Sequence, residues 1–256
     1  MIKNIGTFVR RPIAAMARRV FGTINSVSTS HPVVALTFDD GPHPQFTPML
    51  LDVLKRHLAR ATFFMLGMHA QKYPEIVESV AHGGHAIGNH SWDHPPFTLI
   101  SRGERRRQIR SCERALGPHG LRIFRPPFGY QNLSTRIDAF LIGYQVIAWD
   151  VTADDWLDHD ARLIADRVAQ QTKSGSIILF HDALSCFLDE RYESREQTLE
   201  AVNLLLDKLG EQFQFVTIPE LLLHGKPNRV NWHVQAQSDF LNRLRGPGGT
   251  MWRSPR

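Results

Sequence analysis

Short apolar runs alternate with amphipathic helical stretches along most of the chain, and this alternation restricts the possible folds more than any other feature. The apolar runs are rich in β-branched or aromatic residues and predict strands at Val33–Phe38, Ala61–Leu66, His85–Gly88, Leu121–Phe124, Tyr144–Ala148, Ser176–Phe180 and Phe213–Thr217. The stretches between them have the apolar spacing of a helix and predict helices at Met49–Leu58, Pro74–His82, Glu104–Leu116, Ser134–Ile142, Ala161–Gln171 and Arg195–Leu209. Regular alternation is typical of an α/β fold with a largely parallel sheet.

The number of strand–helix units favours closure of the sheet into a barrel, although periodicity leaves an open sheet as an alternative. A chain of 256 residues, of which 42% are apolar, can bury one substantial core, so we expect a single domain. In βα-barrels the chemistry lies on loops that follow the carboxyl ends of the strands. The reactive side chains fit this rule, because they follow predicted strands: Asp39 and Asp40 the first, His90 and His94 the third, Arg125 the fourth, Asp155 the fifth and His181 the sixth.

The two ends of the chain differ in character from its middle, which divides it into residues 1–30, 31–224 and 225–256. The first segment intersperses apolar residues with Lys3, Arg10, Arg11, Arg18 and Arg19. Over residues 1–27 this spacing fits a basic amphipathic helix, which can either rest on an anionic membrane surface or cover one end of the domain. The last segment has little periodicity and is predicted to be a tail or partly ordered extension of unknown role.

Composition restricts the location and the partners. The arginine pairs interrupt any N-terminal apolar stretch long enough for a secretory signal, so we expect a cytoplasmic protein that at most touches the inner face of the membrane. No apolar run is long enough to predict a membrane-spanning helix. The net charge is +5, but the basic clusters lack interleaved aromatic residues, so no nucleic-acid partner is expected. Cys112 and Cys186 lie far apart and predict neither a disulfide scaffold nor a thiolate zinc site.

Two motifs combine carboxylates and histidines as a metal site requires. Asp39 and Asp40 directly follow the first predicted strand, and because adjacent side chains cannot both point the same way, one can bind a metal while the other faces a reacting water. A turn stabilised by aspartate is the ordinary alternative. His90 and His94 follow a glycine-rich loop, and on one face of a helical turn both imidazoles can reach a single ion, with Asp40 as third ligand. Paired surface histidines are the alternative here.

Two further regions carry groups suited to acid–base chemistry. In Arg125-Pro126-Pro127-Phe128-Gly129, the prolines stiffen the backbone, the arginine can pair with a carboxylate, and the Phe128 N–H is a candidate oxyanion donor. A rigid surface turn would also explain this motif. His181 ends an apolar run and can donate a proton to a leaving amine, with Asp155 as the carboxylate that raises its pKa. A single histidine after a buried strand, or a single Asp-Trp pair, is more often structural. The expectation of an active site rests on the convergence of these residues at one end of the barrel.

With these motifs in order between Val33 and Leu223, the chain resembles the polysaccharide deacetylase family, the family 4 carbohydrate esterases that share the NodB homology domain. The resemblance implies a distorted (β/α)7-type barrel that binds a divalent metal, most often zinc, with cobalt or another divalent ion as alternatives. It implies that Asp40, His90 and His94 are the metal ligands.

The resemblance also implies separate roles for the remaining residues. Asp39 matches the catalytic base, Arg125 the residue that orients it, and Phe128 the backbone amide that helps to hold the oxyanion. His181 matches the catalytic acid, and Asp155 matches the partner that tunes the acid. The chain departs from the family pattern at Thr152, where aspartate is frequent, which puts a peripheral contact in doubt. Phe128 stands where tyrosine is common, which leaves the backbone role intact.

The implied activity is metal-dependent removal of N-acetyl groups from an N-acetylated glycan or sugar precursor, with release of acetate. An O-acetyl esterase, or another amide hydrolase with the same metal site, is the alternative. A non-catalytic glycan-binding protein is disfavoured, because every catalytic position holds a competent residue. Trp156 and Tyr130 are predicted to contact the sugar, since aromatic rings suit the apolar faces of pyranoses.

Overall fold

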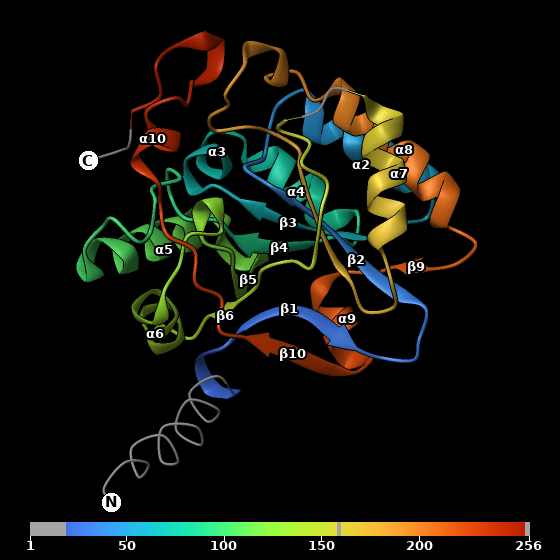
Figure 1. The fold of residues 1–256 in the computed structure, drawn as a ribbon, viewed down its shortest axis with the longest axis horizontal. Coiled ribbons are helices and arrows are strands. Elements are labelled where there is room, and N and C mark those ends of the chain that lie inside the picture. The colour runs from blue at the N-terminus through green and yellow to red at the C-terminus, as the bar shows by residue number, and fades with distance from the viewer. Residues whose placement is uncertain (1–18, 158–159, 254–256) are drawn as a thin grey trace, which may run out of the picture.

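The computed structural model describes residues 19–157 and 160–253, and its centre is a curled sheet of parallel strands (Figure 1). The strands follow the order β6-β5-β4-β3-β2-β8-β7, and β9 pairs with the start of β2. Their bounds are β2 Val33–Asp39, β3 Ala61–Met65, β4 Ala86–Asn89, β5 Gly120–Phe124, β6 Gln145–Val146, β7 Val151–Thr152, β8 Ile177–His181 and β9 Gln214–Phe215. This arrangement confirms the expected distorted (β/α)7-type barrel. Within the described residues, no strand pairing joins β6 to β7, so the barrel is open at that point.

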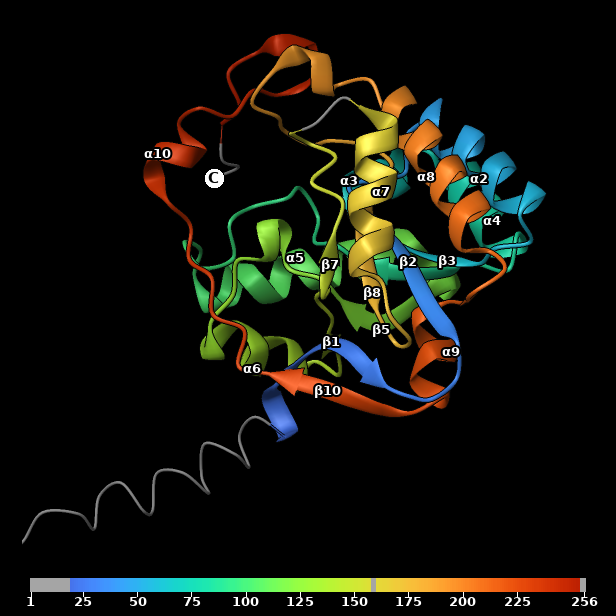
Figure 2. The same ribbon diagram turned by 45° about the vertical axis from the view of Figure 1, so that its right-hand side comes forward.

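Helices cover the outside of this sheet. The six predicted helices are present, with slightly different ends, as α2 Phe46–Arg56, α4 Pro74–His82, α5 Arg102–Leu116, α6 Leu133–Leu141, α7 Ala161–Gln171 and α8 Glu196–Leu209. Three more helices lie at α3 Gly67–Lys72, α9 Ile218–Leu223 and α10 Ser238–Leu241. Figures 1 and 2 show α2, α7 and α8 side by side over one part of the sheet, with α5 and α6 over another.

The central strand β2, which ends at Asp39, is buried along its whole length. Every residue from Val33 to Asp39 is buried, as expected for a parallel strand with both faces covered. Polar groups at the ends of helices fix where the flanking elements begin: the Ser101 hydroxyl accepts from the Glu104 N–H at the start of α5, and Thr217 and Glu220 form a capping box at α9. Loops that carry reactive side chains follow the carboxyl ends of β2, β4 and β8.

The two ends of the described chain meet in a second sheet. β1 (Thr23–Ser28) pairs antiparallel with β10 (Lys226–Val230) below the barrel, as Figure 1 shows. The prediction of a helix over residues 1–27 is therefore wrong for residues 23–27, because strand pairing with a segment 200 residues away overrides the local pattern. The rest of the predicted helix lies largely outside the described residues. Residues 226–253 are not a detached tail, since they pack along the barrel from β10 onward.

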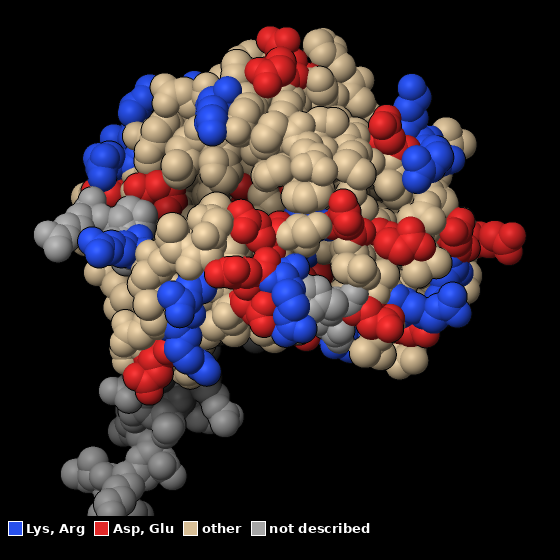
Figure 3. Space-filling view, turned by 90° about the horizontal axis from the view of Figure 1, so that it is seen from above, with Lys and Arg blue, Asp and Glu red and all other residues tan. Residues whose placement is uncertain are grey.

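The surface seen from above carries charges of both signs. Figure 3 shows acidic side chains across the middle of this face and lysine or arginine side chains mostly nearer its edge. Among the described residues, Figure 3 shows no continuous basic area on this face. Among the helices that the structure describes, none is long and apolar enough to span a membrane.

Candidate active site

Asp40, His90 and His94 converge at the carboxyl end of the barrel, and all three are buried. The Nε2 atoms of His90 and His94 each lie 3.2 Å from Asp40 Oδ1. Their candidate ligand atoms all lie within 4.8 Å of one another. Asp40 Oδ1 has no hydrogen-bond partner in the described part of the chain, although burying such an atom is costly. The donor set of two imidazoles and one carboxylate fits a zinc-type ion with an open fourth position.

Left-handed backbone, and not a helical turn, brings the two histidines together. The expectation that His90 and His94 share one face of a helix is wrong, because residues 90–96 form a loop in which Ser91 has φ 76° and His94 has φ 64°. Asp40 also has a positive φ of 73°, which turns its side chain away from that of Asp39. Strained residues of this kind cluster at functional sites, and here all three serve the same cluster.

Hydrogen bonds hold the cluster from outside. The Nδ1 atom of His90 lies 2.7 Å from the Arg125 carbonyl oxygen, which orients Nε2 toward Asp40 when Nδ1 donates. The Ser185 N–H donates to Asp40 Oδ2 at 2.8 Å, which leaves Oδ1 facing the histidines. Gly41 is required beside this contact, since a Cβ there would lie 2.3 Å from Asp182 Oδ2.

The protonation states of the cluster suit metal binding. Burial alone would raise the pKa of Asp40, but His94 and His90 outweigh it and hold the pKa well below its usual range. Burial lowers the pKa of His94 to about 3. At neutral pH the site therefore offers a carboxylate and a neutral imidazole, the forms that bind a metal ion.

Asp39 is held by Arg125, as the sequence motif predicted for an arginine after β5. Arg125 Nη1 donates to Asp39 Oδ1 at 2.7 Å and to Thr37 Oγ1 at 2.8 Å, and Nη2 donates to the Ala148 carbonyl. The guanidinium is fully buried and lies over the Phe64 ring, 4.1 Å from its centroid. Asp39 Oδ2 lies 3.7 Å from His90 Nε2, so this carboxylate borders the metal cluster without belonging to it.

His181 and Asp155 form a second hydrogen-bonded pair near the same end of the barrel. His181 Nδ1 lies 2.8 Å from Asp155 Oδ1, and the His181 N–H donates to Asp155 Oδ2 at 3.0 Å. Burial alone would lower the pKa of His181, but the Asp155 carboxylate outweighs it and raises the pKa. Arg195 Nη2 donates to Asp155 Oδ2 at 2.8 Å, and Thr198 donates to the same oxygen. The Asp155 carboxylate is thus ionised and has partners on both oxygens.

A mostly apolar pocket of about 280 Å³ lies beside Asp39 and the metal-site cluster. Asp39 and His94 lie in its lining together with Phe128, Tyr130 and Trp156. The Phe128 ring centroid is 4.4 Å from that of His94, and Tyr130 stacks on Phe128 at 5.2 Å. The Trp156 ring meets His181 edge-on at 5.1 Å. The structure thus places both predicted sugar-contacting aromatics, Tyr130 and Trp156, in the pocket.

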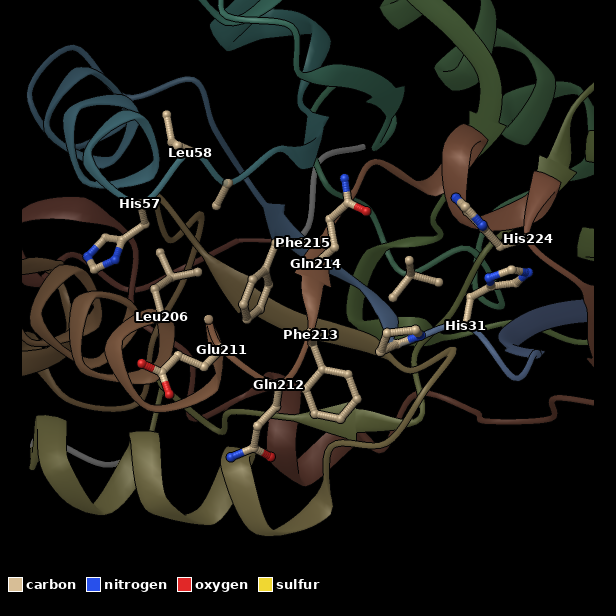
Figure 4. A pocket seen from close by; sticks show the side chains of 14 residues that line it. His31, His57, Leu58, Leu206, Glu211, Gln212, Phe213, Gln214, Phe215 and His224 are labelled. Carbon is tan, nitrogen blue, oxygen red and sulfur yellow. The ribbon is translucent and has the colours of Figure 1, made fainter.

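A second, larger cavity of about 400 Å³ lies at the opposite end of the barrel (Figure 4). Its lining comes from the starts of strands and the loops before them, including His31, His57, Phe213 and His224. His57 pairs with Asn203, and the His31 and His224 rings pack against each other at 5.2 Å. None of these side chains joins the one metal-competent cluster of the described residues.

Several residues of the site were not predicted from the sequence. Ser185 acts through its backbone N–H, which no side-chain pattern reveals. Arg195 is fully buried against Asp155, although its place before a surface helix gives no signal for burial. Phe240 and Leu244, from the C-terminal extension, line the pocket and were assigned to a tail.

The structure combines a barrel of seven strands, a buried Asp-His-His cluster that could hold a metal ion, and the neighbouring pairs Arg125–Asp39 and His181–Asp155. Residues 26–147 match the family model described as polysaccharide deacetylase. The peptidoglycan-N-acetylmuramic acid deacetylase PdaC of Bacillus subtilis is 36% identical over 200 residues, which are 77% of this chain and 40% of PdaC, so the match spans less than half of that relative. A chitooligosaccharide deacetylase of Sinorhizobium fredii is 33% identical over 74% of this chain and 91% of its own length.

Solved structures show the same likeness. The Bc1960 peptidoglycan N-acetylglucosamine deacetylase, solved in complex with a naphthalenyl N-oxidanyl-benzamide, is 31% identical and matches with a TM-score of 0.75 over 85% of this chain and 99% of that chain. The chain belongs to the polysaccharide deacetylase family.

Proposed function

We infer that this protein is a metal-dependent hydrolase that removes N-acetyl groups from an N-acetylated glycan and releases acetate. The observation that carries the proposal is the buried cluster of Asp40, His90 and His94, beside which Asp39 and His181 are each held by their own charged partner. Relatives named as deacetylases of peptidoglycan sugars and of chitooligosaccharides support it.

Asp40, His90 and His94 would hold the metal, and zinc is the ion we propose, because a site with two imidazoles and one carboxylate matches its preferences. The unpartnered Asp40 Oδ1 and the nearby Nε2 atoms fit a cation between them. A bound divalent ion would polarise the acetyl carbonyl and lower the pKa of a water molecule. Cobalt or another divalent ion would satisfy the same donors.

Asp39 is the proposed general base. Its Oδ1 is held by Arg125, which leaves Oδ2, 3.7 Å from His90 Nε2, to take a proton from the attacking water at the edge of the cluster. Arg125 fixes the direction of this carboxylate, because a fully buried guanidinium with further acceptors in Thr37 and Ala148 has little freedom to move.

His181 is the proposed general acid. Asp155 fixes its Nδ1, so Nε2 is the atom left to deliver a proton to the departing sugar nitrogen. The Phe128 N–H is proposed to help hold the oxyanion, since its backbone is fixed at φ 58° between two prolines and Gly129 in the wall of the pocket. Tyr130 and Trp156 are proposed to contact the sugar.

The proposal is tested by acetate release from N-acetylated and O-acetylated glycans after chelation and zinc add-back. We expect acetate from N-acetylglucosamine oligomers or peptidoglycan fragments, no release after chelation, and recovery with zinc. Preferential release from O-acetylated glycans would support the esterase alternative. Contact with a membrane through the basic N-terminal segment and a lipid-linked sugar as substrate stay proposals; unchanged liposome binding after removal of residues 1–18 would contradict them.

A further inference from the structure

Residues 231–252, called the strap below, run from β10 past α10 to the loop that follows β8, as Figure 2 shows. At its start the strap is fixed to the loop after β5. Trp232 Nε1 donates to the Gly129 carbonyl at 3.1 Å. Gln131 and Val234 exchange backbone hydrogen bonds of 3.0 and 3.2 Å. Trp232 and Val234 are therefore hydrogen-bonded to the loop that also carries Phe128, and they form the first anchor of the strap.

The far end of the strap is fixed to a different loop. Phe187 and Arg245 exchange backbone hydrogen bonds of 2.7 and 2.6 Å, and the Gly248 N–H donates to Glu193 Oε1 at 2.9 Å. Phe187 and Leu244 are almost completely buried beside this ladder. Because the loop after β8 also supplies Ser185, the strap bridges two loops that both touch the metal cluster.

Between its anchors the strap reaches into the pocket. Phe240 and Leu244 line the same cavity as Asp39 and His94. The Phe240 ring meets Phe128 edge-on with centroids 6.3 Å apart, and Phe128 in turn lies 4.4 Å from His94. One aromatic ring thus separates the strap from a proposed metal ligand.

We propose that Phe240 and Leu244 are specificity-determining residues that restrict the site to short glycans or glycan ends, an inference that rests on the proposed deacetylation. A sugar inside a long chain continues in two directions and needs an open path on both sides of the metal site. Two apolar side chains of the strap, Phe240 and Leu244, form part of the pocket wall, and we infer that they narrow the path of a chain extending past them. The volume of about 280 Å³ suits a small ligand, and the Phe240 ring offers a surface for the apolar face of one pyranose.

The test compares the kcat/KM of the zinc-loaded protein on the disaccharide and the hexasaccharide of N-acetylglucosamine. We expect the wild type to prefer the disaccharide. Phe240→Ala and Leu244→Ala should each raise the KM for the disaccharide about tenfold, the loss expected from truncating one partly or fully buried apolar contact. Because either truncation removes part of the pocket wall and makes room for a longer chain, the ratio of hexasaccharide to disaccharide kcat/KM should rise by about the same factor.

Val234→Ala is the matched control, because Val234 belongs to the strap but is 39% exposed and is not among the residues that line the pocket. Its ratio should equal that of the wild type. A purely structural strap would instead lower the melting temperature and reduce kcat on both substrates equally, and that result, or an unchanged ratio in both pocket variants, overturns the inference. If the zinc-loaded wild type releases acetate from no N-acetylated glycan, the proposed function fails first and this inference falls with it.

Discussion

Arg125 contributes to both halves of the site at once: its guanidinium donates to Asp39 Oδ1 at 2.7 Å, and its carbonyl oxygen lies 2.7 Å from His90 Nδ1. One residue after β5 thereby sets the direction of the proposed base and of a proposed metal ligand. Since the guanidinium is completely buried, the geometry of the two groups is coupled through a rigid part of the barrel. Because different atoms of Arg125 hold Asp39 and His90, the roles of these two residues can be tested by separate mutations.

Replacement of Asp39 by asparagine should abolish most hydrolysis while metal binding persists. The asparagine carbonyl can still accept from Arg125, but it cannot take a proton from water. We expect kcat to fall by about 10²–10⁴-fold, the usual contribution of a general base. Acetate release and metal content measured on the same preparation check this prediction.

His90→Ala, unlike Asp39→Asn, should lose the metal as well as the activity, because one of the three proposed ligand atoms is removed. Metal content by elemental analysis should fall toward zero, and activity should fall with it. Equal metal content in Asp39→Asn and His90→Ala would contradict the separation of roles.

Replacement of Asp155 by asparagine should shift the pH dependence of kcat. His181 must be protonated to donate, so the rate falls as the pH rises through its pKa. Asp155 raises this pKa, and an asparagine can still accept from Nδ1 but carries no charge. The alkaline limb of the profile should therefore move to lower pH.

Asp154→Asn is the control for this shift, since Asp154 accepts from the Thr152 hydroxyl, whereas His181 is hydrogen-bonded to Asp155. Its alkaline limb should match that of the wild type. An unmoved limb in Asp155→Asn would remove His181 from the role of general acid.

Metal binding should stabilise the folded protein. The ligands are brought together only by folding, so zinc at a hundred times its dissociation constant should add about 2.7 kcal/mol to the free energy of unfolding. The melting temperature of the chelated protein should accordingly rise on zinc addition. His94→Ala should abolish most of this rise, and an equal rise in that variant would place the ion elsewhere.

Arg195→Gln should destabilise the protein and slow the reaction. Arg195 is almost completely buried, and its loss removes the guanidinium that pairs with the buried Asp155 carboxylate, so we expect about 3–5 kcal/mol of lost stability. Chemical denaturation measures the loss. Arg191→Gln, which removes a solvent-exposed pair with Asp189 nearby in the chain, should leave the unfolding midpoint unchanged.

Most elements of the barrel follow from the sequence, although their exact ends do not, and strands β1, β7 and β10 were not predicted. The buried run from Val33 to Asp39 could only be a strand covered on both faces, and the amphipathic stretches between the strands matched the observed helices. Because parallel strands place their carboxyl ends at one edge, the order of the motifs was enough to predict that Asp39, His90 and His181 lie near one another. The spacing of apolar residues indicates which face of a strand or helix is buried, and it does so only within that element.

Only the tertiary structure decided how those residues are aimed and what surrounds them. The positive φ angles of Ser91 and His94 replace the expected helical turn, since the loop is fixed by its contacts and not by its own propensity. Arg195 meets Asp155 across 40 residues, and Leu244 reaches the pocket from the far end of the chain. Such contacts depend on the path of the chain between distant segments, and no local pattern of residues records that path.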